Sequence, residues 1–281
     1  MTIRSSTRAR SAKAQTVASA RWDPAEYAAN SSVQQSWARE LIDRLKLRGN
    51  EHVLDVGCGD GKITAEIART VPRGSVTGMD ASPQMIEFAK KTFPAGKFEN
   101  LRFRVMDARE IRFERRFDLL FSNAALHWVD DHQAFLRGAA SVLQPGGRLV
   151  VSCGGKGNAQ DVFLALRPEM RLKRWRGFFR KIPTPYFFYA PADYEKWLPK
   201  AGFKVQRVKL VPKDAVYAGT KGFAAWLRTT WLPYVQRVPE ALREEFIDAV
   251  VQRYLEKHPV DAGKVHVKMT RLEIEAVKAG D

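Results

Sequence analysis

Cysteine is scarce in this chain, and so are the other signs of a metal-built, disulfide-bonded or membrane-spanning protein. The only cysteines are Cys58 and Cys153, and no cluster of Cys and His has the spacing of a zinc site. No stretch approaches the roughly 18 uninterrupted apolar residues that suggest a membrane span. We therefore expect no disulfide framework, no metal site and no membrane span, and a reducing compartment such as the cytoplasm.

Acidic residues are absent before Asp23, and the 281-residue chain has a formal net charge of +16. Ser, Thr and Ala separate the basic residues of this first segment, so residues 1–22 cannot bury a core and are expected to form a disordered tail. The same composition, rich in Arg and Ser and without acids, is typical of an organelle transit peptide. A cytoplasmic and a mitochondrial location therefore both stay open. The basic residues are Arg4, Arg8, Arg10, Lys13 and Arg21.

Short apolar runs alternate with helical patterns through the first half of the chain. This β-then-α order predicts a doubly wound α/β fold, with a parallel sheet and helices on both of its faces. The expected strands are residues 52–56, 75–79, 101–106, 117–122 and 148–152, and the expected helices are residues 32–47, 62–70, 83–91 and 131–143.

The pattern changes after Cys153. Residues 158–190 are rich in Arg, Lys, Pro and aromatic residues without clear alternation, and we expect them to form a cap inserted over the sheet. Residues 23–281 are expected to form a single domain around a Rossmann-like, seven-stranded sheet. The later elements are expected as helices at 192–200, 221–231 and 239–257 and strands at 203–211 and 265–277.

The strongest local pattern is a glycine-rich turn, Gly57-Cys58-Gly59-Asp60-Gly61, which follows the first strand. Glycine lets the backbone approach a ligand closely, and ligands of open α/β sheets bind beyond the carboxyl ends of the strands. A dinucleotide site would use G-x-G-x-x-G to place a pyrophosphate at a helix N-terminus. Here the spacing is G-x-G-x-G, and the carboxylates of Asp55 and Asp60 would repel a pyrophosphate but suit an ammonium and a sulfonium group. The pattern therefore favours S-adenosylmethionine over NAD.

Acidic residues also follow the second and third strands. Asp80 stands 23 residues after Gly57, where its carboxylate could accept hydrogen bonds from both ribose hydroxyls of a cofactor. Its alternative role is to cap the helix that starts at Ser82-Pro83. Asp107, in Met106-Asp107-Ala108, could accept a hydrogen bond from an adenine amino group, or could serve only in a turn.

The fourth strand ends in small residues followed by two rings. Asn123 and Ala124 leave room beneath the methionine end of the cofactor, and His127 and Trp128 could face the methyl group that is transferred. His127 could act as a general base, or could only orient the substrate through a hydrogen bond.

These motifs, taken in order, resemble those of the class I S-adenosylmethionine-dependent methyltransferases. The stretch Asn-Ala-Ala-Leu-His-Trp-Val at residues 123–129 is most similar to the branch that contains trans-aconitate methyltransferase and other carboxyl O-methyltransferases. The resemblance covers residues 23–278 and rests on residues 54–61, Asp80, and residues 106–108, 117–128 and 143–147.

The resemblance implies a cofactor site at defined positions. Asp55, Gly57 and Gly59 would hold the methionine moiety and Asp80 the ribose. Met106, Asp107 and Ala108 would hold the adenine, and Asn123 the amino-acid end. Tyr27 stands where related proteins fold an N-terminal segment over the cofactor. The candidate cofactor site is completed by Cys58, Ala81, Met85 and Ala124.

Members of that branch mostly methylate carboxylates of small molecules or of carrier-bound acyl groups, and the resemblance implies this activity here. Transfer would be an in-line displacement, in which the protein holds the acceptor near the methyl group and excludes water. A carboxylate is ionised at neutral pH and needs no base, whereas a phenol or an amine would need one. The block at 158–190 could supply an apolar pocket with one or two fixed cations. Its basic residues are Arg167, Arg171, Lys173, Arg174, Arg176, Arg180 and Lys181.

Other functions stay open. Basic residues among aromatic ones are also used to bind single-stranded RNA, and the positive charge would likewise attract an acidic carrier protein. Adenine-amino methylation is disfavoured, because residues 123–126 read Asn-Ala-Ala-Leu in place of an Asn/Asp-Pro-Pro-aromatic tetrad. An RNA methyltransferase and a non-catalytic assembly factor are the alternatives, since a fold alone does not prove activity. Nothing in the sequence indicates the oligomeric state.

Overall fold

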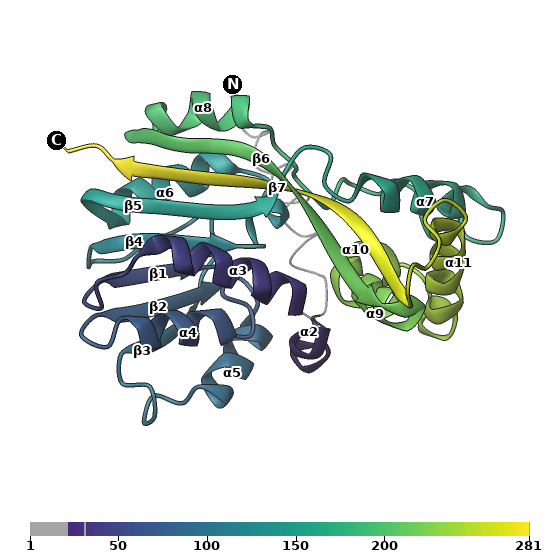
Figure 1. Ribbon diagram of the computed structural model, residues 1–281, viewed down its shortest axis with the longest axis horizontal. Helices are drawn as coiled ribbons and strands as arrows, with labels where there is room; N and C mark the ends of the chain where they lie inside the picture. Colours follow the sequence, from purple (N-terminus) through teal and green to yellow (C-terminus); the bar gives the residue numbers. More distant parts are fainter. Residues whose placement is uncertain (1–21, 31, 281) are drawn as a thin grey trace, which may run out of the picture.

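A mixed sheet of seven strands forms the centre of the structure, a computed structural model that describes residues 22–30 and 32–280 (Figure 1). The strands are β1 (His52–Val56), β2 (Ser75–Asp80), β3 (Leu101–Val105), β4 (Phe117–Asn123), β5 (Leu143–Gly154), β6 (Phe203–Ala218) and β7 (Lys264–Lys278). They lie in the order β3-β2-β1-β4-β5-β7-β6, with β1 to β5 parallel and β7 antiparallel to both of its neighbours. The prediction of a doubly wound, Rossmann-like, seven-stranded sheet is confirmed.

β5 and β6 are longer than the sequence pattern predicted. β5 begins at Leu143, ahead of the Pro145-Gly146-Gly147 segment, and β6 continues past residue 211 to Ala218. β6 pairs with β7 along its length, apart from a bulge between Val205 and Arg207. Backbone hydrogen bonding to β7 therefore extends β6 where its side chains show no regular apolar alternation.

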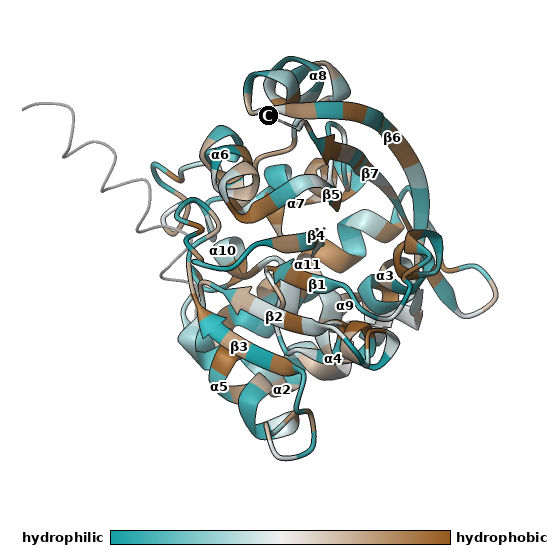
Figure 2. Cartoon of the chain, turned by 90° about the vertical axis from the view of Figure 1, so that its left-hand side faces the viewer, coloured by the Kyte–Doolittle hydropathy of each residue, from teal (hydrophilic) through white to brown (hydrophobic). Residues whose placement is uncertain are grey.

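Helices cover both faces of the sheet. They are α3 (Ser32–Leu45), α4 (Lys62–Thr70), α5 (Pro83–Thr92), α6 (His132–Val142) and α8 (Pro191–Lys200). Figure 2 shows α3 and α4 on one side of the sheet and α6 on the other. Successive side chains of a strand point to opposite faces, so each strand contributes to two cores. Val53 and Leu119 pack in the core with α3, α4 and α5, whereas Leu54 and Leu120 pack in the core with α6 and α8.

A helical lobe stands beside the sheet and is joined to it by the long β6–β7 ribbon (Figure 1). Its elements are α7 (Gln160–Arg171), α9 (Gly219–Thr230), α10 (Leu232–Val235), the short helix η2 (Glu240–Leu242) and α11 (Arg243–Leu255). Phe223 and Phe246 lie in its core, where Tyr217 of β6 and Val267 of β7 join them. Residues 158–190, expected to form a cap, are thus packed together with residues 219–255 in one lobe.

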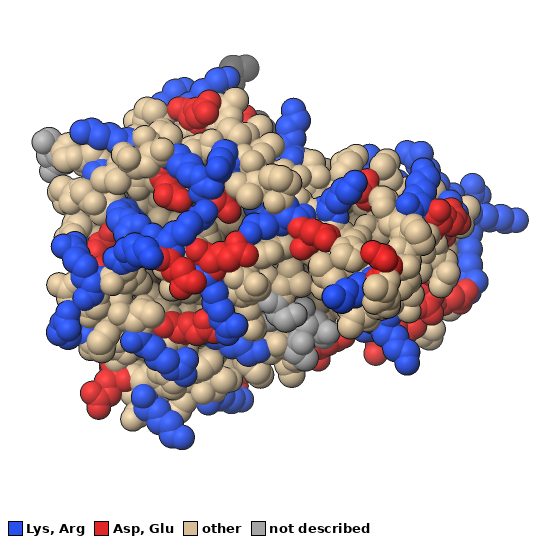
Figure 3. All heavy atoms as spheres, in the orientation of Figure 1, with Lys and Arg blue, Asp and Glu red and all other residues tan. Residues whose placement is uncertain are grey.

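Basic side chains are spread over the face of the molecule in Figure 3, over the sheet and the lobe, with acidic side chains among them. The tail expected at residues 1–22 lies outside the described residues, except for Trp22. In the described part of the chain, no helix is long and apolar enough to cross a membrane. No group of three or more His, Cys, Asp or Glu among the same residues could hold a metal ion. Cys58 and Cys153 are both buried free thiols.

Candidate active site

A cleft of about 590 Å³ lies at the carboxyl ends of β1, β2 and β4. The turns after these strands form its walls, so residues distant in sequence meet at one edge of the sheet. Trp128 lines the cleft, whereas Asp55, Cys58 and His127 do not. The other predicted cofactor residues all line it, namely Tyr27, Gly57, Gly59, Asp80, Ala81, Met85, Met106, Asp107, Ala108, Asn123 and Ala124.

The turn after β1 requires glycine at position 57. Gly57 has a φ of +76°, and a Cβ added there would lie 2.1 Å from the Cβ of Ala125. The N–H groups of Gly57 and Cys58 both donate to the carbonyl of Met79, at 2.7 and 3.0 Å. The turn is therefore packed tightly against the neighbouring strand ends, with backbone rather than side chains facing the cleft.

Asp80 is fixed at the end of β2, with its carboxylate in the wall of the cleft. Its Oδ2 accepts the N–H of Gly59 at 3.0 Å, and its Oδ1 accepts the N–H of Ser82 at 2.9 Å. Burial raises the pKa of Asp80, although these hydrogen bonds oppose the shift. The cap of α5 is Ser82, whose hydroxyl accepts the N–H of Met85 at 3.3 Å. The helix therefore does not depend on Asp80 as its cap, and the remaining lone pairs of the carboxylate can accept hydrogen bonds from a ligand.

Asp55 and Cys58 lie behind the glycine turn rather than in the cleft. Asp55 is 3% exposed, and its carboxylate accepts the hydroxyl of Thr64 at 2.7 Å. Burial raises the pKa of Asp55 to about 7. Asp60 differs, because its Oδ2 is buried without a hydrogen-bond partner among the described residues, and Lys62 Nζ is 3.4 Å away. Asp60 does not line the cleft either, so the turn faces the cleft with Gly57 and Gly59 rather than with its carboxylates.

Asp107, at the end of β3, is paired with Arg109. Arg109 Nη2 lies 2.6 Å from Asp107 Oδ2, and Arg109 Nη1 lies 3.0 Å from Asp130 Oδ1. Burial alone would raise the pKa of Asp107, but hydrogen bonds from Arg109 hold it below its ordinary value. Asp107 therefore stays ionised and can accept a hydrogen bond from an amino group of a ligand.

A second cavity of about 80 Å³ adjoins the cleft on the side of the helical lobe, and we call it the inner chamber. The two cavities share Trp22, Tyr27, Ala124 and Trp128 as lining residues. Ala124, at the boundary, has a φ of +57°, a strained conformation for a residue with a Cβ. The rest of the wall of the inner chamber is largely aromatic. Its rings come from α3, β6 and the lobe, and they are Trp37, Tyr186, Phe188, Tyr217, Trp226 and Trp231.

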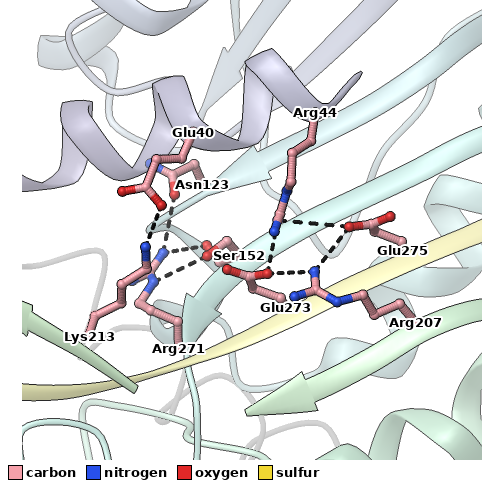
Figure 4. Close-up of polar contacts among 9 residues, drawn as sticks. All are labelled: Glu40, Arg44, Asn123, Ser152, Arg207, Lys213, Arg271, Glu273 and Glu275. Atoms are coloured by element: carbon pink, nitrogen blue, oxygen red, sulfur yellow. Dashed lines mark hydrogen bonds and ion pairs between the residues drawn. The ribbon is translucent and has the colours of Figure 1, made fainter. Parts of the chain in front are cut away.

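A buried arginine, Arg271 of β7, also lines the inner chamber, and sequence reasoning missed it. Arg271 is 4% exposed, and its guanidinium donates to the carbonyl of Ser152 at 2.6 Å and to Asn123 Oδ1 at 3.2 Å (Figure 4). The guanidinium lies 5.4 Å from the centroid of the Trp37 ring. Burial lowers the pKa of Arg271. The only signal in the sequence is a basic residue inside an expected strand, which does not distinguish Arg271 from Lys268.

His127 lines the inner chamber from η1 (Leu126–Trp128), whereas its neighbour Trp128 lines both cavities. The Nδ1 of His127 accepts the N–H of Gly154 at 3.3 Å, so the proton of the neutral ring lies on Nε2. Burial, together with the nearby Arg271 and His132, lowers the pKa of His127 to about 3. At neutral pH the ring is therefore a hydrogen-bond donor and a very weak base.

The basic residues of the 158–190 block do not reach either cavity. All of them are exposed, and none lines the cleft or the inner chamber. Arg174, for example, pairs with Glu245 on α11. The expectation that this block supplies one or two cations to the pocket is therefore wrong, because these long side chains extend into solvent. The block contributes rings instead, with Phe187 lining the cleft and Tyr186 and Phe188 lining the inner chamber.

Known proteins are similar to this chain over most of its length. The family model described as "Methyltransferase domain" matches residues 47–175, which hold β1 to β5 and the glycine turn. An uncharacterized methyltransferase of Schizosaccharomyces pombe is 30% identical, over 82% of this chain and 89% of its own length. A trans-aconitate 2-methyltransferase of Enterobacter sp. is 36% identical, over 89% of this chain and 96% of its own length.

Solved structures share the fold at lower identity. The YcgJ protein from Bacillus subtilis has a TM-score of 0.60 at 17% identity, covering 88% of this chain and 100% of its own. Phosphoethanolamine N-methyltransferase 2 of Haemonchus contortus, in complex with S-adenosyl-L-methionine, has a TM-score of 0.55 at 18% identity. That match covers 87% of this chain and 53% of the Haemonchus protein.

Proposed function

Because this chain belongs to the class I S-adenosylmethionine-dependent methyltransferases, near the trans-aconitate 2-methyltransferase branch, we propose that it O-methylates a carboxylate of a small molecule. It is an enzyme that uses S-adenosylmethionine, the cofactor present in a solved structure of the same fold. The proposal adds the chemical class of the acceptor, which the wall of the inner chamber supports.

The proposal rests on the presence of a buried Arg271 and a neutral His127 among the residues that line the inner chamber. A buried guanidinium binds a carboxylate strongly, because charged hydrogen bonds strengthen where water is excluded. The Nε2–H of His127 is a second donor on the same chamber wall. A carboxylate acceptor is already ionised at neutral pH and needs no base. A phenol or an amine would need one, and a histidine with a pKa of about 3 is a poor base for it.

The cleft is the site that we assign to the cofactor. Asp80, in the wall of the cleft, would accept hydrogen bonds from the ribose, and the segment Met106 to Ala108 would hold the adenine. Asn123 and the turn at Gly57 and Gly59 would hold the methionine end. When bound there, S-adenosylmethionine supplies an electrophilic methyl group on a sulfonium.

Three further residues support the cofactor from around the turn. Asp55 and Cys58 contribute by holding the turn from behind, since neither side chain lines the cleft. Asp60 does not line the cleft either, and its Oδ2 lies 3.4 Å from Lys62 Nζ, so its carboxylate would act on the cofactor ammonium only through its negative charge.

An aromatic wall positions the acceptor at the boundary of the two cavities. The Trp22 ring meets the rings of Tyr27, on α2 (Pro24–Asn30), and of Trp128 edge-on, with centroids 5.6 and 5.3 Å away. This wall excludes water and limits how the acceptor can approach the methyl group, which is the main help a protein gives to an in-line displacement. We therefore assign Trp128 a positioning role and His127 an orienting role rather than one as a base.

Methyl transfer to a panel of acceptors tests the proposal. The protein is incubated with S-adenosylmethionine and with carboxylic acids, phenols or primary amines, and release of S-adenosylhomocysteine is measured while mass spectrometry identifies the product. We expect methyl esters from acids, and loss of turnover in Asp80→Ala at a cofactor concentration that saturates the wild type. Ethers or methylamines formed in the absence of any ester would contradict the proposal.

A further inference from the structure

The inner chamber contains a cation that no acid of the described chain pairs with. The hydrogen-bond partners of Arg271 are a backbone carbonyl, a hydroxyl and an amide, and none of the ion pairs among the described residues includes it. Other arginines of the same region are paired, since Arg44 and Arg207 lie 2.9 and 2.6 Å from the carboxylate of Glu273 (Figure 4). A buried guanidinium without a counterion is unfavourable in the empty protein, so the chamber is suited to an anionic ligand.

We infer that the acceptor is a compact monocarboxylic acid with a planar, apolar body, and that Arg271 binds its carboxylate in the inner chamber. This inference rests on the proposed carboxylate methylation and specifies the substrate class of the same site. Three features support it: the charge balance of the two cavities, the shape of the chamber and the position of Arg271 relative to the cofactor.

Charge balance limits the acceptor to one carboxylate. At neutral pH Arg271 is the only charged residue among those that line the inner chamber, all of which belong to the described chain. In the adjoining cleft the lining includes one other cation, Arg109, which is already paired with Asp107 and Asp130. A second or third carboxylate would be buried without a cation, which is strongly unfavourable. A tricarboxylate such as trans-aconitate is therefore a poor fit, despite the similarity to trans-aconitate 2-methyltransferases.

The walls of the chamber favour flat, apolar groups. The rings of Tyr186 and Phe188 are nearly parallel with centroids 5.6 Å apart, and Trp231 meets Tyr186 edge-on at 5.6 Å. Trp226 stacks on Tyr217 with centroids 5.2 Å apart. Rings that pack on one another move little, so the space between them is preformed. The chamber, at about 80 Å³, is much smaller than the adjoining cleft of about 590 Å³, which restricts the acid to a compact body such as a single ring or a short unsaturated chain.

The methionine carboxylate of the cofactor is the competing anion for Arg271. Asn123 stands between the two positions, because it lines the cleft while its Oδ1 accepts a hydrogen bond from Arg271. Arg271 itself lines the inner chamber and not the cleft. This position favours the acceptor as its ligand, and the variants below distinguish the two anions.

The first experiment compares acceptors on the wild-type protein. Phenylacetate and cinnamate are the monocarboxylic probes and trans-aconitate is the tricarboxylic one, and kcat/KM is measured from release of S-adenosylhomocysteine. We expect the better monocarboxylate to exceed trans-aconitate in kcat/KM by about tenfold or more. Preference for trans-aconitate, or no ester from either monocarboxylate, overturns the inference and leaves carboxylate methylation standing if any acid reacts. Reaction of phenols or amines alone overturns both.

The second experiment assigns the anion that Arg271 binds. Arg271→Gln removes the charge, Arg271→Lys keeps it, and Arg207→Gln removes a cation on β6 that lines neither cavity. For Arg271→Gln we expect the KM of the preferred monocarboxylate to rise by about 10- to 100-fold, with partial recovery in Arg271→Lys and no change in Arg207→Gln. The Kd of S-adenosylhomocysteine, measured by calorimetry, should change by less than about twofold. Weaker cofactor binding with an unchanged acceptor KM would assign Arg271 to the cofactor and overturn the inference.

A ligand pair tests the same contact without a substitution, since loss of Arg271 could also loosen β5 and β7. Phenylacetate and the neutral, nearly isosteric phenylacetamide are titrated into the wild-type protein saturated with S-adenosylhomocysteine. We expect the acid to bind about tenfold more tightly or better, because only the acid pairs with the guanidinium. Equal affinity of acid and amide overturns the inference.

Discussion

The cofactor cleft and the inner chamber share a wall but are built by different means. The cleft is formed mostly by short turns, each directly after one of the strands β1 to β4, although Trp22, Tyr27 and residues 182–184 and 187 also line it. Its polar groups are largely backbone N–H groups and carboxylates. The inner chamber is formed by side chains from both ends of the chain, such as Trp37 of α3, Trp231 after α9 and Arg271 of β7. The proposed cofactor site is therefore built mainly from short segments of sequence, whereas the proposed acceptor site depends on how the lobe, α3 and the β6–β7 ribbon pack together.

Ion pairs between α3 and the β6–β7 ribbon contribute to that packing. Glu40 of α3 pairs with Lys213 of β6, and Arg44 of α3 pairs with Glu273 of β7 (Figure 4). These contacts fix the helix that brings Trp37 against Arg271. The two sites should therefore respond separately to substitution, the cleft to changes in its turns and the chamber to changes in its rings.

Gly57→Ala should have the largest effect, a loss of cofactor affinity that leaves the inner chamber unchanged. The added Cβ would lie 2.1 Å from that of Ala125, so the turn must move away from the strand ends. We expect the affinity for S-adenosylhomocysteine, measured by calorimetry, to fall by about 100-fold or more, because small displacements in a preorganised site have large effects. Gly146→Ala is the matched control, since Gly146 also has a φ of +76° but nothing within 4 Å of an added Cβ. A similar loss of affinity in both variants would mean that backbone strain alone explains the result.

Asp80→Ala should have the next largest effect. The substitution removes acceptors for the ligand and for the N–H groups of Gly59 and Ser82. We expect binding of S-adenosylhomocysteine to weaken by about 1–3 kcal/mol, while the acceptor KM at saturating cofactor stays nearly constant. Glu87→Gln, on the exposed side of α5, is the control carboxylate. A rise in acceptor KM as large as the loss of cofactor affinity would contradict the separation of the two sites.

Trp231→Leu should affect the chamber alone and more modestly. Trp231 lines the inner chamber but not the cleft, so its truncation enlarges the acceptor site. We expect the acceptor KM to rise by about 5- to 30-fold, equivalent to the loss of one aromatic contact of about 1–2 kcal/mol, with unchanged cofactor affinity. Trp197→Leu, a partly buried tryptophan on the opposite side of the sheet, should lower stability without changing the acceptor KM. Equal kinetic effects of the two substitutions would refute the assignment.

Substitution of His127 should have the smallest effect, on the pH dependence of kcat/KM. A profile of the same shape in the variant and in the wild type would argue against His127 as a general base. With the pKa of His127 at about 3, neither this ring nor a carboxylate acceptor titrates between about pH 6 and pH 9. Any inflection of kcat/KM in this range, such as one from Asp55 with its pKa of about 7, should therefore be the same in the wild type and in His127→Gln. The measurement is the pH profile of kcat/KM in the wild type and in His127→Gln. An inflection near pH 6.5 that disappears in the variant would restore His127 as a general base.

The wild type and His127→Gln should also differ in how the free energy of unfolding depends on pH. The folded-state pKa of His127 is lowered, so the unfolded chain binds the proton more readily and the free energy of unfolding falls as the pH drops below about 6.5. Asp55, with its pKa raised to about 7, shifts stability in the opposite direction over this window. The difference between the variant and the wild type removes that contribution. As the pH falls from 7 to 5, the free energy of unfolding of His127→Gln should therefore rise relative to that of the wild type.

The sequence pattern predicted the strands and the cleft well, because both depend on short-range signals. Apolar runs marked the strands, and the residues just after them line the cleft. The direction of Asp55 was harder to predict. Within β1 the alternation of side chains turns this carboxylate toward Thr64 of α4 rather than toward the glycine turn.

The inner chamber could not be predicted, because its parts are far apart in sequence. Arg271 reaches Ser152 across 119 residues and Asn123 across 148 residues. Composition pointed instead to the basic block near residue 170, where the charges are exposed on the lobe. Charge content alone does not reveal which cation is buried, since burial depends on tertiary packing.

The most direct test of two separable sites, one for the cofactor and one for the proposed carboxylate acceptor, is a sequential calorimetric titration. S-adenosylhomocysteine is titrated first and phenylacetate second, into the wild type, Asp80→Ala and Trp231→Leu. We expect Asp80→Ala to weaken only the binding of S-adenosylhomocysteine and Trp231→Leu to weaken only the binding of phenylacetate. Weakening of both titrations by either variant, or no binding of phenylacetate to the wild-type complex, would contradict this expectation.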